Sequence, residues 1–178
     1  MKFKSIAFLI IFITTTQLSA FQLPKRILKK VQKELVKTYD RKELKLVEIT
    51  VSEVVNAQLG KRIYAANLFQ IVDATEIVGY AYIGKAPSKT DEFDFLIILD
   101  KELIIKKSKV LIYREDYGAE IGSRRWLKQF IGKSTKDHLK YRRDIMAISG
   151  ATISALSMTQ AINQFLSDLT ILQKHHIF

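Results

Sequence analysis

The middle of the chain consists of β-like runs that are separated only by short polar turns. The runs are rich in Ile, Val, Phe and Tyr, and no helix-length segment lies between them. Parallel strands need a long crossover, whereas antiparallel strands can be joined by a tight turn. The pattern therefore predicts an antiparallel meander with a hairpin reversal at Asp100-Lys101. Strands are expected at residues 62–72, 77–83, 93–99, 103–105 and 110–113, and residues 46–52 fit a half-buried strand or a frayed helix.

Helical patterns flank these runs in the sequence. Residues 24–39 carry an apolar stripe opposite a face of lysines, and Pro24 is tolerated in a first turn. This helix could lie on a membrane, but we expect its stripe to pack on its own domain. Two more helices are predicted at residues 120–131, ended by Gly132, and at 154–173, which has a highly regular stripe. The predicted fold class is α+β: an antiparallel sheet meander with an N-terminal helix and two C-terminal helices.

Length and composition exclude several classes of protein. A chain of 178 residues suits a single domain, and an apolar content of 48% argues against disorder. Because the chain has no cysteine, a disulfide framework, an iron–sulfur cluster and a cysteine nucleophile are excluded. Its three histidines, His138, His175 and His176, leave little material for a zinc site, so no metal ligands are predicted.

The N-terminus has the pattern of an export signal. Two lysines precede an unbroken apolar run at residues 6–13, and a small residue, Ala20, stands at a plausible cleavage point. The run is too short to span a bilayer, which needs about 20 apolar residues. We therefore predict a signal peptide at residues 1–20, a single domain at 21–178, and a periplasmic or other extracytoplasmic location. An uncleaved anchor, which would keep the protein at the membrane, is the alternative.

The positive charge of the chain is concentrated in two segments. The whole chain has a formal net charge of +11, whereas residues 21–45 alone have +6 and residues 124–143 have +7. An exported protein rarely meets nucleic acid, and the chain has no nucleic-acid recognition motif, so nucleic acid is not expected as a partner. An anionic membrane surface or a bound phosphate fits better. A solvated basic face is the plain alternative.

A stretch of small and hydroxyl residues leads into the last predicted helix, Ser149-Gly150-Ala151-Thr152-Ile153-Ser154. Its glycine and alanine allow a ligand or another part of the backbone to approach closely. A helix N-terminus offers free N–H groups and the positive end of the helix dipole, which together favour a phosphate. The alternative is an ordinary helix start, in which Ser149, Thr152 or Ser154 would be the N-cap.

This stretch resembles the flavinylation motif of the FMN-binding domain family, which includes the covalent-flavin subunits of sodium-pumping NADH:quinone reductase and of Rnf-type complexes. The resemblance implies that a dedicated flavin transferase esterifies Thr152 to the phosphate of FMN, outside the cytoplasmic membrane. A looser resemblance lies upstream, in an acidic residue, a Gly-rich turn and a short helix. It rests on Glu115, Gly118, Ile121, Gln129, Phe130, Gly132 and Lys133.

One position departs from the family pattern. The family usually has an aspartate six positions before the modified threonine, and Met146 stands there in this chain. Asp144 lies two residues earlier, which on an extended backbone is about 6.6 Å along the strand. The departure keeps a second hypothesis open: a binding or scaffold module of the same fold that carries no attached flavin and docks to a membrane or a redox complex.

The resemblance implies an electron-transfer flavoprotein rather than a self-sufficient enzyme, with FMN as cofactor and with redox partners in the membrane or periplasm. A hydrolase that used Ser149 or Thr152 would lack a base, because His138 is the only histidine near them in sequence. The predicted cofactor-binding residues are Thr152, Ser149, Gly150, Ala151, Ile153, Ser154, Glu115, Gly118 and Trp126. Further ligand contacts, one or two in number, are expected from Arg124, Arg125, Lys128 and Lys133, and an aromatic wall beside the flavin from Trp126 or Tyr117.

Overall fold

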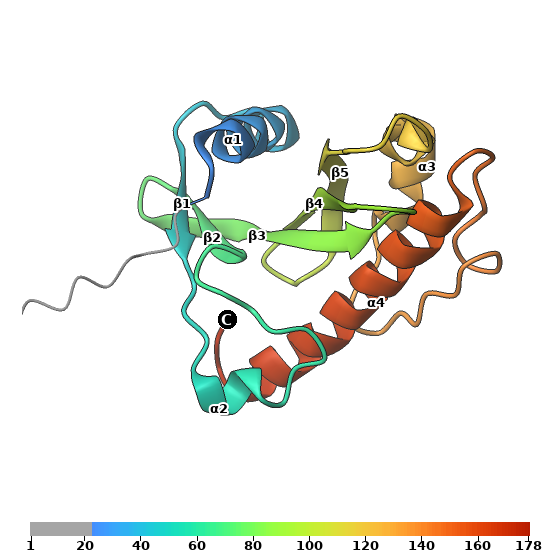
Figure 1. Ribbon diagram of the computed structural model, residues 1–178. Coiled ribbons are helices and arrows are strands. Elements are labelled where there is room, and N and C mark those ends of the chain that lie inside the picture. Colours follow the sequence, from blue (N-terminus) through green and yellow to red (C-terminus); the bar gives the residue numbers. More distant parts are fainter. Residues whose placement is uncertain (1–22) are drawn as a thin grey trace, which may run out of the picture.

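The computed structural model describes residues 23–178, and its centre is a five-stranded antiparallel sheet in the order β1-β2-β3-β4-β5 (Figure 1). Each strand pairs with the next one in sequence, which confirms the predicted meander. The predicted signal peptide at residues 1–20 lies outside the described residues. The strands are β1 (Leu44–Glu48), β2 (Leu68–Asp73), β3 (Glu76–Pro87), β4 (Glu92–Leu99) and β5 (Ile105–Ile112).

The hairpin between β4 and β5 reverses where the sequence predicts it. The Asp100 carboxylate accepts hydrogen bonds from the backbone N–H groups of Glu102 (3.1 Å) and Ile104 (2.8 Å), which closes the turn. Three strand predictions are wrong in extent. The runs predicted at 103–105 and 110–113 are replaced by one continuous strand, β5, which covers residues 105–112, and the run at 62–72 becomes a strand only from residue 68. The short helix α2 (Glu53–Asn56) was not predicted, because four residues show no periodicity.

Two long helices cover the sheet, one on each face (Figure 1). The first, α1 (Lys25–Tyr39), buries an apolar stripe that includes Val31 and Leu35 against one face, which confirms that this stripe packs on its own domain. The second, α4 (Thr152–Lys174), buries its stripe in a separate cluster on the other face. There Phe165 stacks on Tyr82 of β3, with ring centroids 3.8 Å apart. Within residues 23–178, no helix is long and apolar enough to cross a membrane.

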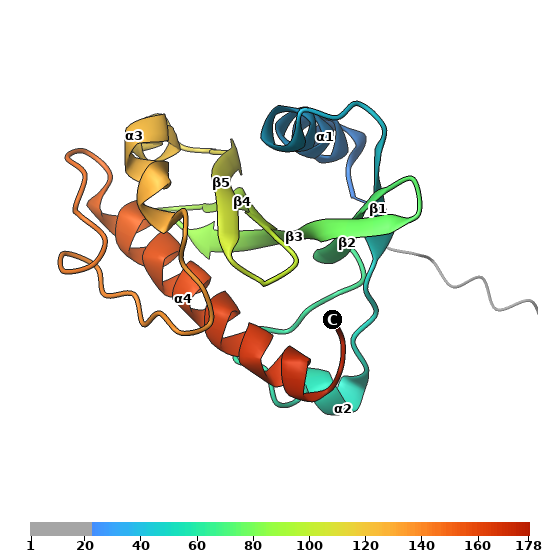
Figure 2. The same ribbon diagram turned by 180° about the vertical axis from the view of Figure 1, so that it is seen from behind.

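The helix predicted at residues 120–131 is wrong as a continuous element. It is broken into η1 (Ala119–Gly122), α3 (Arg124–Leu127) and η2 (Lys128–Phe130), because Ser123 has an extended backbone (φ −66°, ψ 135°). The edge strand β5 holds these pieces. The Ser108 hydroxyl donates to the carbonyl of Leu127 (2.8 Å), and the N–H of Gly132 donates to the carbonyl of Ile105 (2.8 Å). As a result α3 lies beside β5, near the N-terminal end of α4 (Figure 2).

Candidate functional site

The chain enters α4 through the small-residue turn that the sequence singles out. Gly150 has a left-handed backbone (φ +82°), and Ala151 occupies the N-cap position. No side chain among the described residues caps this helix. The N-cap assignments to Ser149, Thr152 or Ser154 are therefore wrong, since the residue at the cap has no polar side chain.

The first turn of α4 is consequently open. The backbone N–H groups of residues 152–154 have no hydrogen-bond partner within the described part of the chain, as at any uncapped helix start. Thr152 is the first residue of the helix and is exposed, and the next side chain, Ile153, is 52% exposed. An accessible hydroxyl thus lies beside free N–H donors at the positive end of a 23-residue helix. The arrangement favours an oxyanion at this end of α4.

The end of β5 and the turn after it pack against the first turn of α4 and the motif turn before it. The hydroxyls of Tyr113 and Ser154 are hydrogen-bonded at 2.9 Å. Gly118 has a φ of +88°, and a Cβ there would lie 2.5 Å from the Tyr113 hydroxyl and 3.5 Å from the carbonyl oxygen of Gly150. A Cβ on Gly150 would in turn lie 3.2 Å from the carboxyl group of Glu120. The structure therefore brings Gly118 to the motif turn and adds Tyr113 and Glu120, for which the sequence carries no signal.

The carboxylate of Glu115 is hydrogen-bonded to the hairpin between β3 and β4. It accepts hydrogen bonds from the Ser88 hydroxyl (2.6 Å) and from the backbone N–H of Thr90 (2.6 Å), and these bonds lower the pKa of Glu115 to about 2. The hairpin touches α4, because the Ser157 hydroxyl donates to the carbonyl of Pro87. Glu115 is thus close to α4 but engaged elsewhere, and its contact with a cofactor stays a prediction.

A cavity of about 330 Å³ opens beside the motif turn. Trp126 is 4% exposed, and its Nε1–H donates to the carbonyl of Met146 (2.8 Å), while the side chain of Gln129 accepts from the N–H of Met146 (2.7 Å). The volume is at the lower end of the range for small-molecule sites. The lining residues are Ser123, Arg125, Trp126, Gln129, Met146, Ala147, Ile148 and Ser149.

The basic and aromatic residues that the sequence proposes as cofactor contacts do not all line the cavity beside the motif turn. Arg125 lines this cavity, whereas Arg124 and Lys128 line a different hollow. Lys133 forms an ion pair with an aspartate four residues along the chain (3.3 Å). Tyr117 is 86% exposed and is not among the residues that line the cavity. Of the two aromatic candidates, Trp126 is therefore the one that faces it.

The approach to the motif is a tight turn and not the extended segment considered above. The Asp144 carboxylate pairs with Arg143 (3.0 Å) and accepts the N–H of Lys140 (2.8 Å), and both contacts lower the pKa of Asp144. Met146 follows the turn and is 71% exposed. Asp144 is thus held in its own turn and does not take the place of an aspartate at position 146.

Comparison with known proteins assigns this region to a family. Residues 89–167 match the family model of the FMN-binding domain, from the turn before β4 into α4. A comparison with curated proteins gives no match. The matched segment contains the open end of α4 and the cavity beside Trp126, and these fit the phosphate and the ring system of a flavin nucleotide. The chain therefore carries a domain of the FMN-binding domain family, and its cofactor is FMN.

Proposed function

We propose that this protein is exported, carries FMN as a phosphoester on Thr152, and transfers electrons between partners at the outer side of the cytoplasmic membrane. The observation that carries the proposal is the position of Thr152: an exposed hydroxyl at the uncapped N-terminus of α4, inside the segment that matches the family. The export signal at residues 1–20 supports the location.

The backbone of the first helical turn would hold the phosphate. The N–H groups of residues 152–154 are free to donate, and the helix dipole adds a favourable field for a negative group. The Ser154 hydroxyl is already bonded to Tyr113, so this residue would contribute its N–H rather than its side chain. Ser149 is exposed, so its hydroxyl is accessible to a phosphate oxygen, and Arg125 offers positive charge from the wall of the cavity.

The attachment needs an activated phosphate donor, for which we propose a flavin dinucleotide. The Thr152 oxygen forms a bond to the phosphorus of the FMN half, the phosphoanhydride bond of the donor breaks, and a nucleoside monophosphate leaves. The hydroxyl proton passes to a base of the flavin transferase. The protein therefore gains the mass of FMN less one water.

The cavity beside the motif turn would take the ring system. Trp126 is buried and fixed by its hydrogen bond to Met146, so it offers a rigid wall, and Ala147 and Ile148 add apolar surface. FMN supplies one- or two-electron redox chemistry when bound, and the protein sets its exposure and orientation. A covalent link keeps the cofactor from being lost outside the cell, which suits an electron carrier better than an enzyme with a freely exchanging cofactor.

The wider setting of the proposal is a single domain at residues 21–178 that follows a signal peptide cleaved after Ala20. A flavin transferase would be its modifying partner, and membrane or periplasmic redox proteins would be its electron donor and acceptor. Intact-mass analysis of the exported protein tests the first part: a chain that begins at Phe21 supports cleavage, and a chain that retains residues 1–20 supports the anchored alternative.

In-gel flavin fluorescence after denaturation tests the attachment. The protein is exported from a host that has the transferase, and wild type is compared with Thr152→Ala, with Thr152→Ser and with Thr170→Ala, an exposed threonine of the same helix. We expect a fluorescent band in wild type and in Thr170→Ala, a weaker band in Thr152→Ser, and none in Thr152→Ala. A dark wild-type band, beside a fluorescent control flavoprotein from the same host, would favour the scaffold hypothesis.

A further inference from the structure

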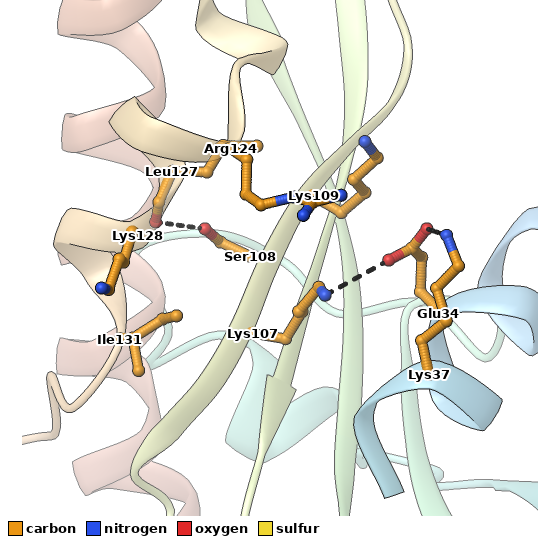
Figure 3. A pocket seen from close by; sticks show the side chains of 9 residues that line it. All are labelled: Glu34, Lys37, Lys107, Ser108, Lys109, Arg124, Leu127, Lys128 and Ile131. Atoms are coloured by element: carbon orange, nitrogen blue, oxygen red, sulfur yellow. Dashed lines mark hydrogen bonds and ion pairs between the residues drawn. The ribbon is translucent and has the colours of Figure 1, made fainter. Parts of the chain in front are cut away.

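A second hollow lies between α1, β5 and α3 (Figure 3). Its volume is about 350 Å³. Arg124 and Arg125 are neighbours on α3, yet Arg124 lines this hollow and Arg125 lines the cavity beside the motif turn. The two sites are therefore separate. We call this one the cationic hollow and define it by Glu34, Lys37, Lys107, Lys109, Arg124 and Lys128.

The fold gathers positive charge here from distant parts of the sequence. Lys37 comes from the basic segment 21–45 and Arg124 from the basic segment 124–143, and β5 contributes Lys107 and Lys109 between them. The hollow thus unites the two segments in which the charge of the chain is concentrated. Five cations and one carboxylate give its lining a net charge of +4.

The carboxylate of Glu34 pairs with the lysines on one side of the hollow and leaves the cations on the other side without a counter-charge from it. Glu34 is 8% exposed and pairs with Lys37 and with Lys107, at 3.5 Å each. Lys109 and Arg124 form no ion pair within residues 23–178. Figure 3 shows the Arg124 side chain extending from α3 toward Lys109 on β5. Like charges repel, so an anion between these two side chains would relieve an unfavourable arrangement.

The shape of the hollow indicates what kind of anion fits. The side chain of Lys107 is 31% exposed and Lys109 is half-buried, whereas Lys37, Arg124 and Lys128 are exposed, so the hollow combines partly buried cations with accessible ones. The hollow has the size of a small-molecule site. A guanidinium offers a planar fork of donors and an ammonium a compact charge, a combination that suits the several oxygens of a phosphate.

We propose that the cationic hollow binds a phosphate-bearing ligand, at a site distinct from the flavin attachment point. The phosphate can belong to a free compound or to the headgroup of an anionic phospholipid, and both present the same chemistry to Lys109 and Arg124. The site does not require flavin on Thr152, so its test is independent of the proposed function.

Two binding measurements on the purified protein test the site and identify the source of the phosphate. The first is calorimetric titration with pyrophosphate. The second is co-sedimentation with vesicles of phosphatidylcholine alone or mixed with phosphatidylglycerol. We expect saturable binding in at least one of them, weakened as ionic strength rises. Binding of pyrophosphate assigns the site to a free phosphate, and binding only to the phosphatidylglycerol vesicles assigns it to a headgroup.

Matched variants show whether the hollow is responsible. The double variant Lys109→Gln/Arg124→Gln should weaken the observed binding at least tenfold. The control Lys61→Gln/Lys174→Gln removes two exposed cations elsewhere and should change it less than twofold. Glu34→Gln, which removes the one carboxylate found in the lining within residues 23–178, should strengthen binding several-fold. Circular dichroism spectra confirm that each variant is folded.

Three results would overturn the proposal. The first is no binding of either phosphate probe. The second is an equal loss in the hollow variant and in the control, which would mean that net charge alone attracts the probe. The third is binding of poly-glutamate without binding of pyrophosphate or phosphatidylglycerol vesicles, which would point to an acidic protein segment instead.

Discussion

The two ends of α4 are held in opposite ways by the rest of the fold. Toward its C-terminal end, Asp168 is 1% exposed, and its carboxylate accepts the backbone N–H groups of Gly60 (2.8 Å) and Lys61 (3.1 Å) and the side-chain amide of Gln164 (3.0 Å). At its N-terminal end the N–H groups of residues 152–154 have no partner among residues 23–178, and Thr152 is exposed. The buried Asp168 thus ties α4 to the loop before β2, whereas the backbone N–H groups of its first turn stay open to a ligand.

The largest effect on stability is expected from breaking the anchored end. Asp168→Ala leaves the backbone N–H groups of Gly60 and Lys61, in the loop between α2 and β2, without their acceptor. We expect a loss of about 2–3 kcal/mol in the free energy of unfolding. For a chain of this size that corresponds to a fall in Tm of roughly 5–10 °C. Thermal unfolding followed by circular dichroism measures it. Asp116→Ala, an exposed aspartate in the turn after β5, is the control and should leave Tm unchanged.

The same variant sharpens the comparison between the two ends. Below its Tm, Asp168→Ala should still carry flavin on Thr152, because the open turn is at the far end of the helix. Loss of the flavin band from protein that is folded by circular dichroism would mean that the two ends do not act separately.

A smaller effect on stability, with a direct effect on the site, is expected from Gly118→Ala. The new Cβ would lie 2.5 Å from the Tyr113 hydroxyl, at a φ of +88°. We expect a loss of about 1–2 kcal/mol, the cost of a left-handed backbone at a non-glycine residue, and a weaker flavin band because the motif turn must shift. Gly122→Ala is a matched control, since its Cβ meets nothing within 4 Å. Equal losses in both variants would contradict the close packing of the turn at Gly118.

The smallest effect is expected at Glu115 and depends on pH. Hydrogen bonds from the Ser88 hydroxyl and the Thr90 N–H lower the pKa of Glu115 to about 2 from an ordinary value of 4.5. A carboxyl group with a lowered pKa in the folded state contributes stability above its unfolded value and loses that contribution as the pH falls toward 2. The difference in Tm between wild type and Glu115→Gln should therefore be largest at pH 5–7 and shrink toward pH 2. A difference that stays constant over this range would contradict the assignment.

Much of the fold follows from local pattern. The short polar turns predict the meander, and the Asp100 turn forms as expected because its carboxylate caps two N–H groups within four residues. The break at Ser123 could not be predicted in this way. The segment 120–131 has helical composition, and it is the tertiary bond from Ser108 of β5 to Leu127 that helps to hold its pieces in place.

Only the part of the site that is contiguous in sequence could be predicted. The small-residue motif and the helix after it are contiguous, so their join at Thr152 can be read from the sequence. Tyr113 lies 41 residues from its partner Ser154, and Glu120 lies 30 residues before Gly150, which it approaches in space. No spacing rule connects residues that far apart. The union of the two basic segments in the cationic hollow depends likewise on the placement of α1 and α3 around β5.

Peptide mapping of the exported protein tests the central claim most directly. Cleavage after lysine and arginine yields one peptide from Asp144 to Lys174, which contains the whole motif. The account predicts that this peptide carries the mass of FMN less one water and that fragmentation places the addition on Thr152. An unmodified peptide, from cells whose transferase labels a control protein, or an addition on any other residue would contradict it.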